Sequence, residues 1–194
     1  MSLDLSALND GDLAALSLGG RQAAYAEIMR RHRDALYRLV VGNIGDPEEA
    51  LDLVQETFVA AHQALARYDG SRPMRRWLST IALNKCRDWR RRRAVRRMFA
   101  FALPLDASSA EVAEDRVLPD AEAADREEVR RVTSAIAQLP RPLREPLVLR
   151  AVEGLSQAET AAILGITEKA VETRVRRARA SLSEQLERGR SAAP

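Results

Sequence analysis

Cysteine, histidine and aromatic residues are scarce in this 194-residue chain. It has one cysteine, Cys86, and two histidines, and Trp, Tyr and Phe together make up only 4% of it. A single cysteine cannot form a disulfide framework or a cysteine-based zinc site, and two histidines leave little for a metal centre. We therefore expect neither a metal nor any other cofactor.

Long apolar runs are also missing. No stretch of about 18 apolar residues is present, so we expect no segment that spans a membrane. The first residues, MSLDLSALNDGD, are acidic and lack the basic region and apolar stretch of a signal peptide. The sequence therefore predicts a cytoplasmic protein. Because it has no phosphate-binding loop, nucleophile elbow or paired histidines, we expect a binding protein and not an enzyme.

The net charge of +3 conceals four segments of opposite sign. Residues 1–71 carry a net charge of −5, residues 72–98 of +10, residues 99–129 of −7 and residues 130–194 of +5. Two basic blocks separated by an acidic one are typical of a protein that binds a polyanion. Solvated helix faces produce the same basic runs, so the charge pattern alone leaves both interpretations open.

Helical periodicity predicts an all-α fold, and no β-strand candidate is present. Apolar residues recur at helical spacing within residues 20–41. Asp46 can cap a second helix that reaches about Arg67, and Pro73 opens a third that reaches about Arg97. We place a first domain of three helices at residues 1–98.

The second predicted helix has a core face and an acidic face. One apolar stripe, which we expect to face the domain core, is formed by Leu51, Val54, Phe58 and Leu65. The opposite face holds Asp52, Glu56, Val59 and Gln63, with Gln55 at its margin. An acidic face can dock a basic partner surface, or it can simply be solvated.

The third predicted helix places arginines beside tryptophans. Trp77, Leu78, Ile81 and Trp89 supply apolar anchoring, whereas Arg76, Arg87 and Arg90 share another face. Basic side chains beside aromatic ones suit unpaired DNA, because its bases stack and its phosphates need neutralising. Core packing explains either tryptophan at least as well.

An acidic linker is predicted at residues 99–126. Pro104, Pro119 and most of the acidic excess fall there, and the small apolar residues have no clear period. We expect this segment to be largely extended or disordered. The alternative is a short acidic helix around residues 122–132, and the second half of the linker favours it.

The last predicted domain, residues 127–194, has the pattern of a helix-turn-helix. Ser156 and Glu159 fit a capping box, Gly165 can supply the positive φ of a tight turn, and Thr167 can cap the second helix. That helix has an apolar stripe, formed by Val171, Val175, Ala178 and Leu182, and an opposite basic face with Lys169, Thr173, Arg176 and Arg177. Such a helix suits groove entry and phosphate contact, although an ordinary αα-hairpin would share the pattern.

Three motifs, in this order, resemble the bacterial sigma factors of the extracytoplasmic-function (ECF) class. These are compact members of the sigma-70 family that keep only its second and fourth conserved regions. DLVQETF at 52–58 is similar to the helix that docks on the coiled coil of the RNA polymerase β′ subunit. WLSTIALNKCRDWRRRR at 77–93 is similar to the segment for the promoter −10 element and for melting, and residues 139–182 resemble the −35-binding region.

The resemblance implies roles for the matched residues. Core polymerase would contact Asp52, Gln55 and Glu56. The −10 element would be bound by Trp77, Asn84, Lys85, Arg87 and Arg90, with Asn84 helping to capture a flipped base. The −35 element would be bound by Lys169, Glu172, Thr173, Arg174, Arg176 and Arg177. Members of the family usually have a basic residue, Lys or Arg, at the position of Glu172. An acidic residue there can accept a hydrogen bond from cytosine N4, so the −35 preference stays open.

The function implied is that of an RNA polymerase sigma factor, which directs core polymerase (its β′ and β subunits) to specific promoters and assists melting. An anti-sigma factor is the expected inhibitor. A stand-alone helix-turn-helix regulator is the alternative; it would explain residues 139–186 but not the basic third helix or the acidic face. A helical adaptor or membrane-surface protein is a third hypothesis, against which Asn84, Lys85 and Asp88 count, because they make the third helix a poor interfacial anchor.

Overall fold

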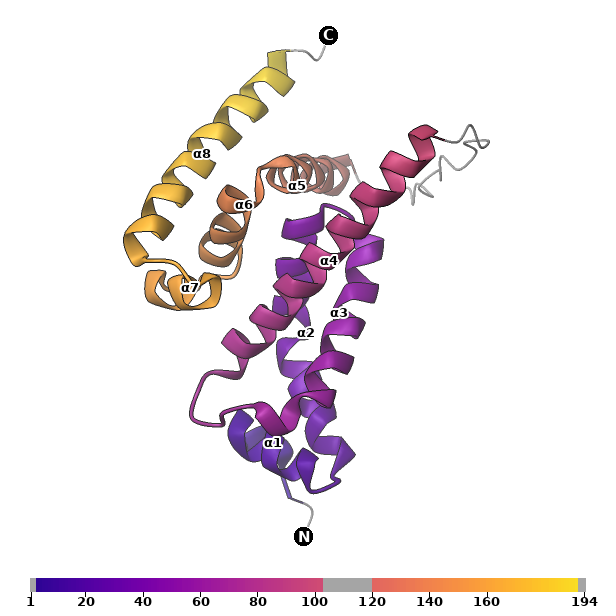
Figure 1. Ribbon diagram of the computed structural model, residues 1–194, viewed down its shortest axis with the longest axis vertical. Coiled ribbons are helices and arrows are strands. Elements are labelled where there is room, and N and C mark those ends of the chain that lie inside the picture. Colours follow the sequence, from indigo (N-terminus) through magenta and orange to yellow (C-terminus); the bar gives the residue numbers. More distant parts are fainter. Residues whose placement is uncertain (1–2, 103–119, 192–194) are drawn as a thin grey trace.

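The computed structural model describes residues 3–102 and 120–191, and this part of the chain is helical with no strand (Figure 1). The N-terminal bundle comprises α1 (Asp10–Leu18), α2 (Gln22–Ile44), α3 (Pro47–Gln63) and α4 (Met74–Ala102). The C-terminal bundle comprises α5 (Asp120–Gln138), α6 (Arg141–Leu147), α7 (Gln157–Leu164) and α8 (Glu168–Ser191). Short 3₁₀ turns lie at Leu5–Ala7 and Leu65–Arg67, and a π-helical turn at Val148–Val152 follows α6. The expected all-α class is confirmed.

The predicted capping residues begin α3 and α7 and end α7, whereas α3 ends at Gln63 and not near Arg67, and α4 extends to Ala102, beyond the predicted Arg97. The Asp46 side chain accepts a hydrogen bond from the Glu49 amide at 3.2 Å, and Pro47 is the first residue of α3. Ser156 and Glu159 form the reciprocal capping box, with bonds of 2.7 and 3.1 Å. Gly165 ends α7 with a φ of 65°. The helix-turn-helix outline is therefore correct.

The N-terminal end and the linker differ from the prediction. Helix α1 was not predicted, since its buried side chains, Leu13 and Ala14, are too few to show a helical period. Arg31 of α2 holds the chain that precedes α1 by donating to the carbonyls of Leu5, Ser6 and Leu8. Helix α5 begins inside the predicted linker, so the helical alternative for its second half is correct. The rest of that linker, 103–119, lies outside the described residues.

Leu51 is not a core residue, contrary to the prediction. The buried positions of α3 are Ala50, Leu53, Val54, Thr57, Phe58 and Ala61. Leu51 falls beyond the edge of that stripe and its residue surface is 46% exposed. The other three predicted members, Val54, Phe58 and Leu65, are buried as expected.

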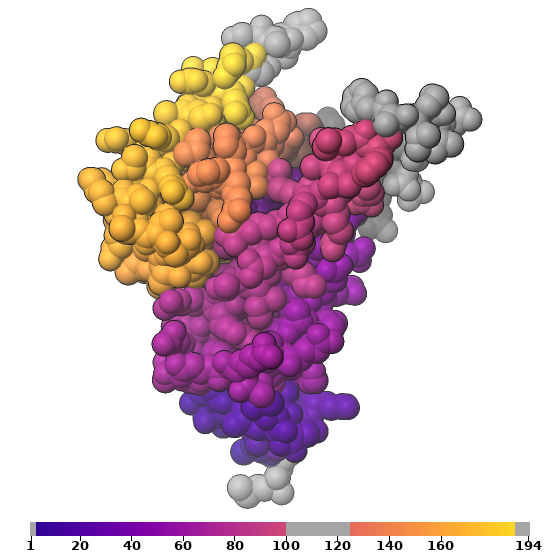
Figure 2. Space-filling view, in the orientation of Figure 1, coloured from indigo at the N-terminus to yellow at the C-terminus, as the bar shows by residue number. Residues whose placement is uncertain are grey.

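The two bundles pack against each other and share one continuous apolar core. Helix α2 contacts α5 and the π-helical turn, and α4 contacts α7. Figures 1 and 2 show the C-terminal bundle beside the half of α2 and α4 that is remote from α1. Two glycines, one within α2 and one at its C-cap, allow the C-terminal bundle to approach α2 closely. A Cβ on Gly42 would lie 3.1 Å from a Val148 methyl, and one on Gly45, at a φ of 77°, would lie 2.6 Å from the Ala137 Cβ.

Gly45→Ala should cost more stability than Gly154→Ala. Both glycines have a positive φ, which costs an L-residue about 1–2 kcal/mol. Only Gly45 adds a clash with the other bundle, since a Cβ on Gly154 would have no neighbour within 4 Å. Urea unfolding of the two variants measures the difference. Equal losses would show that the contact between Gly45 and Ala137 does not persist in solution.

Candidate nucleic-acid interface

The exposed face of α3 presents the predicted polymerase-binding residues around an apolar centre. Asp52, Gln55 and Glu56 are all exposed. Leu51 and Val59, 46% and 58% exposed, lie beside them. Leu51, Gln55 and Val59 help to line a groove of 670 Å³, together with Tyr25, Met29, Phe58 and His62. The spacing of four residues between Leu51, Gln55 and Val59 is the signal that could have identified this apolar centre.

A direct contact joins this face to the predicted −10 residues of α4. The Lys85 ammonium lies 3.2 Å from a Glu56 carboxylate oxygen. The neighbouring Asn84 is exposed, and its side-chain oxygen accepts a hydrogen bond from Arg87 at 2.9 Å. Two sets of residues that the sequence assigns to different partners are thus adjacent on one surface.

The two tryptophans of α4 occupy different environments. Trp89 is buried, its indole N–H donates to Glu49 at 2.8 Å, and the Arg93 guanidinium lies 4.9 Å from its ring centroid. Trp77 is half-buried and packs against Tyr68, with ring centroids 5.2 Å apart. Trp89 is therefore a core residue, whereas Trp77 keeps part of its surface exposed.

Arg87 and Arg90 contact the C-terminal bundle. Arg87 donates two hydrogen bonds, of 2.8 and 2.7 Å, to the two oxygens of Glu145, and this pairing raises the pKa of Arg87. Arg90 donates to the carbonyl oxygens of Asn43 and Ala137, each at 2.6 Å. Burial lowers the pKa of Arg90. Both arginines were predicted to face DNA, and in this arrangement both are engaged by protein.

The exposed side of α8 carries the predicted −35 residues. Val171, Val175 and Ala178 are buried beneath it, as the helical wheel predicts. Lys169 and Glu172 pair at 2.9 Å, and this bond lowers the pKa of Glu172. The Thr173 hydroxyl donates to the Lys169 carbonyl at 2.9 Å, so it bonds to its own helix. Arg176 and Arg177 are exposed and Arg174 is half-buried.

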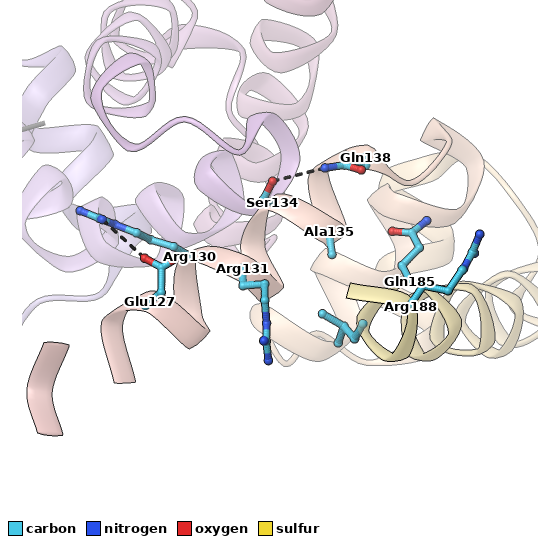
Figure 3. A pocket seen from close by; sticks show the side chains of 9 residues that line it. Glu127, Arg130, Arg131, Ser134, Ala135, Gln138, Gln185 and Arg188 are labelled. Carbon is cyan, nitrogen blue, oxygen red and sulfur yellow. Dashed lines mark hydrogen bonds and ion pairs between the residues drawn. The ribbon is translucent and has the colours of Figure 1, made fainter. Parts of the chain in front are cut away.

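A further pocket of 540 Å³ lies between α5 and α8 and contains none of the predicted site residues (Figure 3). Its two α5 cations are paired within that helix: Arg130 lies 3.8 Å from Glu127, and Arg131 bonds to Glu128. Arg188 of α8 donates to the Glu184 carbonyl at 3.1 Å. Gln138 donates to Ser134 at 3.4 Å. Among the described residues no group of His, Cys, Asp and Glu could hold a metal ion, and no helix could cross a membrane.

Comparison with known proteins identifies both bundles. Residues 28–96 match the family described as sigma-70 region 2, and residues 130–182 match sigma-70, region 4. The chain belongs to the sigma-70 family. The first match covers α3 and most of α4, and the second covers the helix-turn-helix. The family and motif order inferred from the sequence are confirmed.

Relatives of this sigma factor include members of the ECF class. RNA polymerase sigma factor CnrH of Cupriavidus metallidurans is 43% identical, over 92% of this chain and 94% of the relative. The ECF RNA polymerase sigma factor SigW of Bacillus subtilis is 30% identical, over 86% and 91%. The solved structure of CnrH in complex with the cytosolic domain of CnrY matches with a TM-score of 0.67, over 92% of this chain and 97% of CnrH, at 38% identity. The sigma factor is thus of the ECF class.

The single thiol should be inert in the folded sigma factor. Burial raises the pKa of Cys86 to about 12, despite the nearby cations Arg144, Arg90 and Arg87. At pH 8.5 the thiolate is then less than roughly one part in a thousand, whereas an ordinary cysteine is about half ionised. Alkylation by iodoacetamide, followed by mass spectrometry, should be negligible in buffer and rapid in guanidinium chloride. Equally rapid alkylation under both conditions would contradict the burial.

Proposed function

We propose that this sigma factor binds core RNA polymerase through α3 and promoter DNA through α4 and α8, and so directs transcription to specific promoters. The contact between Glu56 and Lys85 is the observation that carries this proposal. It puts the α3 face and the DNA-facing residues of α4 next to each other. One bundle can therefore hold polymerase and the promoter strand together. The β′ coiled coil is the docking partner that the family resemblance implies.

On α4, Asn84 and Lys85 act on the −10 element and assist melting. Asn84 is exposed and offers an amide to the edge of a flipped base. Lys85 is beside it and supplies a cation for the strand. Half-buried Trp77 lies about two helical turns before Asn84, on the same side of α4, and supplies an aromatic edge. Arg87 and Arg90 neutralise phosphates once the C-terminal bundle has left them.

On α8, the residues separate into those that position the helix and those that read sequence. Arg176 and Arg177 are exposed cations that suit phosphates, whereas Lys169 and Glu172 stand at the N-terminal end of the recognition helix. Glu172 can accept a hydrogen bond from cytosine N4. We assign −35 preference to this end of the helix.

An anti-sigma factor is the proposed inhibitor. CnrH, which is similar over nearly the whole chain, has been solved in complex with the cytosolic domain of CnrY. The apolar groove beside Gln55 on α3 is a surface that a protein inhibitor and polymerase would both occupy. Purification of the sigma factor from its native cells should recover such a partner. Recovery of the chain alone, in cells that are not transcribing its promoters, would count against it.

Reversing the charge of the α3 face should abolish promoter-specific transcription. Asp52→Arg/Glu56→Arg replaces two acidic side chains of the wild-type docking face with cations. Because both side chains are exposed, the fold should tolerate the change. Run-off transcription with purified core polymerase on a library of promoter fragments measures the effect. The matched control is Glu184→Arg/Glu187→Arg, which makes the same charge change at exposed positions near the end of α8.

The control should keep its transcripts and the α3 variant should lose them. Transcripts that survive in the α3 variant would overturn the docking assignment. Specific binding to duplex DNA without polymerase, together with no transcript from the wild type, would favour the stand-alone helix-turn-helix regulator.

Substitutions on α8 should separate affinity from specificity. Arg176→Ala/Arg177→Ala should weaken holoenzyme binding to all −35 sequences and reduce its salt dependence by about two units of slope. Glu172→Gln should change the preferred base at one position, a discrimination of about 1–3 kcal/mol. Binding of promoter variants at several salt concentrations measures both effects. A uniform loss of affinity in Glu172→Gln would show that this residue does not read sequence.

A further inference from the structure

The last turns of α4 combine clustered arginines with exposed apolar side chains. Six of the eight residues 90–97 are arginine. Met98 and Phe99, which follow them, are 74% and 66% exposed, more than any other large apolar residue in the described part of the chain. We propose that this end of α4 binds an anionic lipid membrane surface, with its apolar side chains in the lipid and its arginines at the headgroups.

The apolar side chains share one side of the helix. Met98 and Phe99 follow Val95 by three and four residues, which places all three next to one another on the surface of α4. Val95 is 45% exposed. Figure 1 shows this end of α4 extending beyond α3. Contiguous apolar side chains that a soluble protein leaves exposed usually mark a site of interaction.

Three exposed arginines border the apolar side chains. Arg91 and Arg92 lie one helical turn before Val95, and Arg96 lies one turn before Phe99, so each arginine is next to an apolar neighbour. Within the described part of the chain, Arg92 and Arg96 form no ion pair with an acidic side chain. Their charges are therefore available to an anionic ligand.

The opposite side of α4 is occupied by protein. Arg90 donates to backbone carbonyls of both bundles, and the Arg93 guanidinium lies 4.9 Å from the ring centroid of Trp89. Arg90 and Arg93 precede Val95 by five and two residues, which puts them on the other side of the helix. The arginines of this stretch thus divide into a set that packs and a set that borders the apolar side chains.

An anionic membrane fits this surface better than DNA does. Phosphates of a duplex would pair with the arginines, but they offer nothing to Val95, Met98 and Phe99. A membrane engages both kinds of group, because apolar side chains enter the boundary between headgroups and acyl chains while arginines meet the lipid phosphates. Asp88, whose side chain is 47% exposed, also lies between Asn84 and the apolar end on the same side of α4, in the path of a DNA strand.

The strength of the interaction follows from the size of the surface. A short apolar insertion alone gives marginal binding, and so does a basic cluster alone, but the two together retain a protein at an anionic surface. Asn84, Lys85 and Asp88, which make the middle of α4 a poor interfacial anchor, lie about two or more turns before Val95. Binding should therefore be reversible, need anionic lipid and involve only the end of the helix.

Cosedimentation of the full chain with lipid vesicles tests the proposal. Vesicles of phosphatidylcholine alone are compared with vesicles that also contain phosphatidylglycerol, which is anionic. Wild type should bind the anionic vesicles more tightly by about tenfold or more, and this binding should weaken as the salt concentration rises. Equal binding to both kinds of vesicle, or no binding to either at low salt, would overturn the proposal.

Two variants separate the apolar side chains from the charges. Met98→Ser/Phe99→Ser removes two apolar side chains, and Arg92→Gln/Arg96→Gln removes two charges. Each should lower the affinity for anionic vesicles by about tenfold or more. All four side chains are exposed, so the fold should tolerate both changes, and circular dichroism checks it. If the serine variant binds as tightly as wild type, charge alone carries the binding and the insertion is wrong.

Matched controls make the same chemical changes elsewhere. Val129→Ser removes an apolar side chain that is 64% exposed on α5. Arg21→Gln/Arg67→Gln removes two charges from exposed positions of the N-terminal bundle. Both controls should bind anionic vesicles as wild type does. Losses in the controls as large as those in the α4 variants would show that the end of α4 is not a distinct binding surface.

A fluorophore at the end of α4 reports insertion without depending on a loss of binding. Met98→Cys is labelled with a dye whose emission responds to polarity, while the buried Cys86 stays unlabelled. Anionic vesicles should shift the emission to shorter wavelength, as the dye enters an apolar environment. Val129→Cys, labelled in the same way, should not shift. Bound protein with an unshifted dye at position 98 would place the membrane contact elsewhere and overturn the proposal.

Nucleic acid is the competing ligand for the same surface. Fluorescence anisotropy with a labelled duplex and a labelled single strand measures DNA binding of wild type and of Met98→Ser/Phe99→Ser. Unchanged DNA binding in this variant, together with lost vesicle binding, would support lipid as the ligand. DNA binding that falls by about tenfold, with a wild type that ignores vesicles, would identify the end of α4 as a nucleic-acid contact and overturn the proposal.

Discussion

Two almost fully buried carboxylates fix how the halves of this sigma factor meet. A buried carboxylate without a partner costs several kcal/mol, so Glu145 and Glu153 can pack only where cations meet them. Arg87, Arg75 and Arg38 of the N-terminal bundle supply those cations. The register of the two bundles follows from this pairing. Gly42 and Gly45 then allow Val148 and Ala137 to approach closely.

The arginines of α4 and those of α8 differ in what they contact. Arg87 and Arg90 are engaged across the bundle contact, but Arg176 and Arg177 stay exposed. The described arrangement therefore covers part of the basic side of α4 and leaves that of α8 open. The blocks at 72–98 and 130–194 both carry a net positive charge, but that charge does not reveal which of their arginines contact protein.

Local signals in the sequence predicted the helices and the buried face of α8, because capping and periodicity act within one element. Asp46, the Ser156–Glu159 box and the Val171 stripe illustrate this success. Periodicity indicates that a face is buried but not what buries it. The partner of Arg87 is 58 residues away, so no local pattern could identify Glu145. The prediction that Leu51 lies in the core was wrong for a related reason. An apolar residue at the edge of a stripe can face a groove as well as the core. The roles of the exposed residues rest on the family resemblance.

The buried ion pairs do not by themselves hold the two bundles together. Separation would return Glu145 and Glu153 to water, which would remove the cost of burying them. What holds the bundles closed is then chiefly the apolar contact of the π-helical turn and α5 with α2.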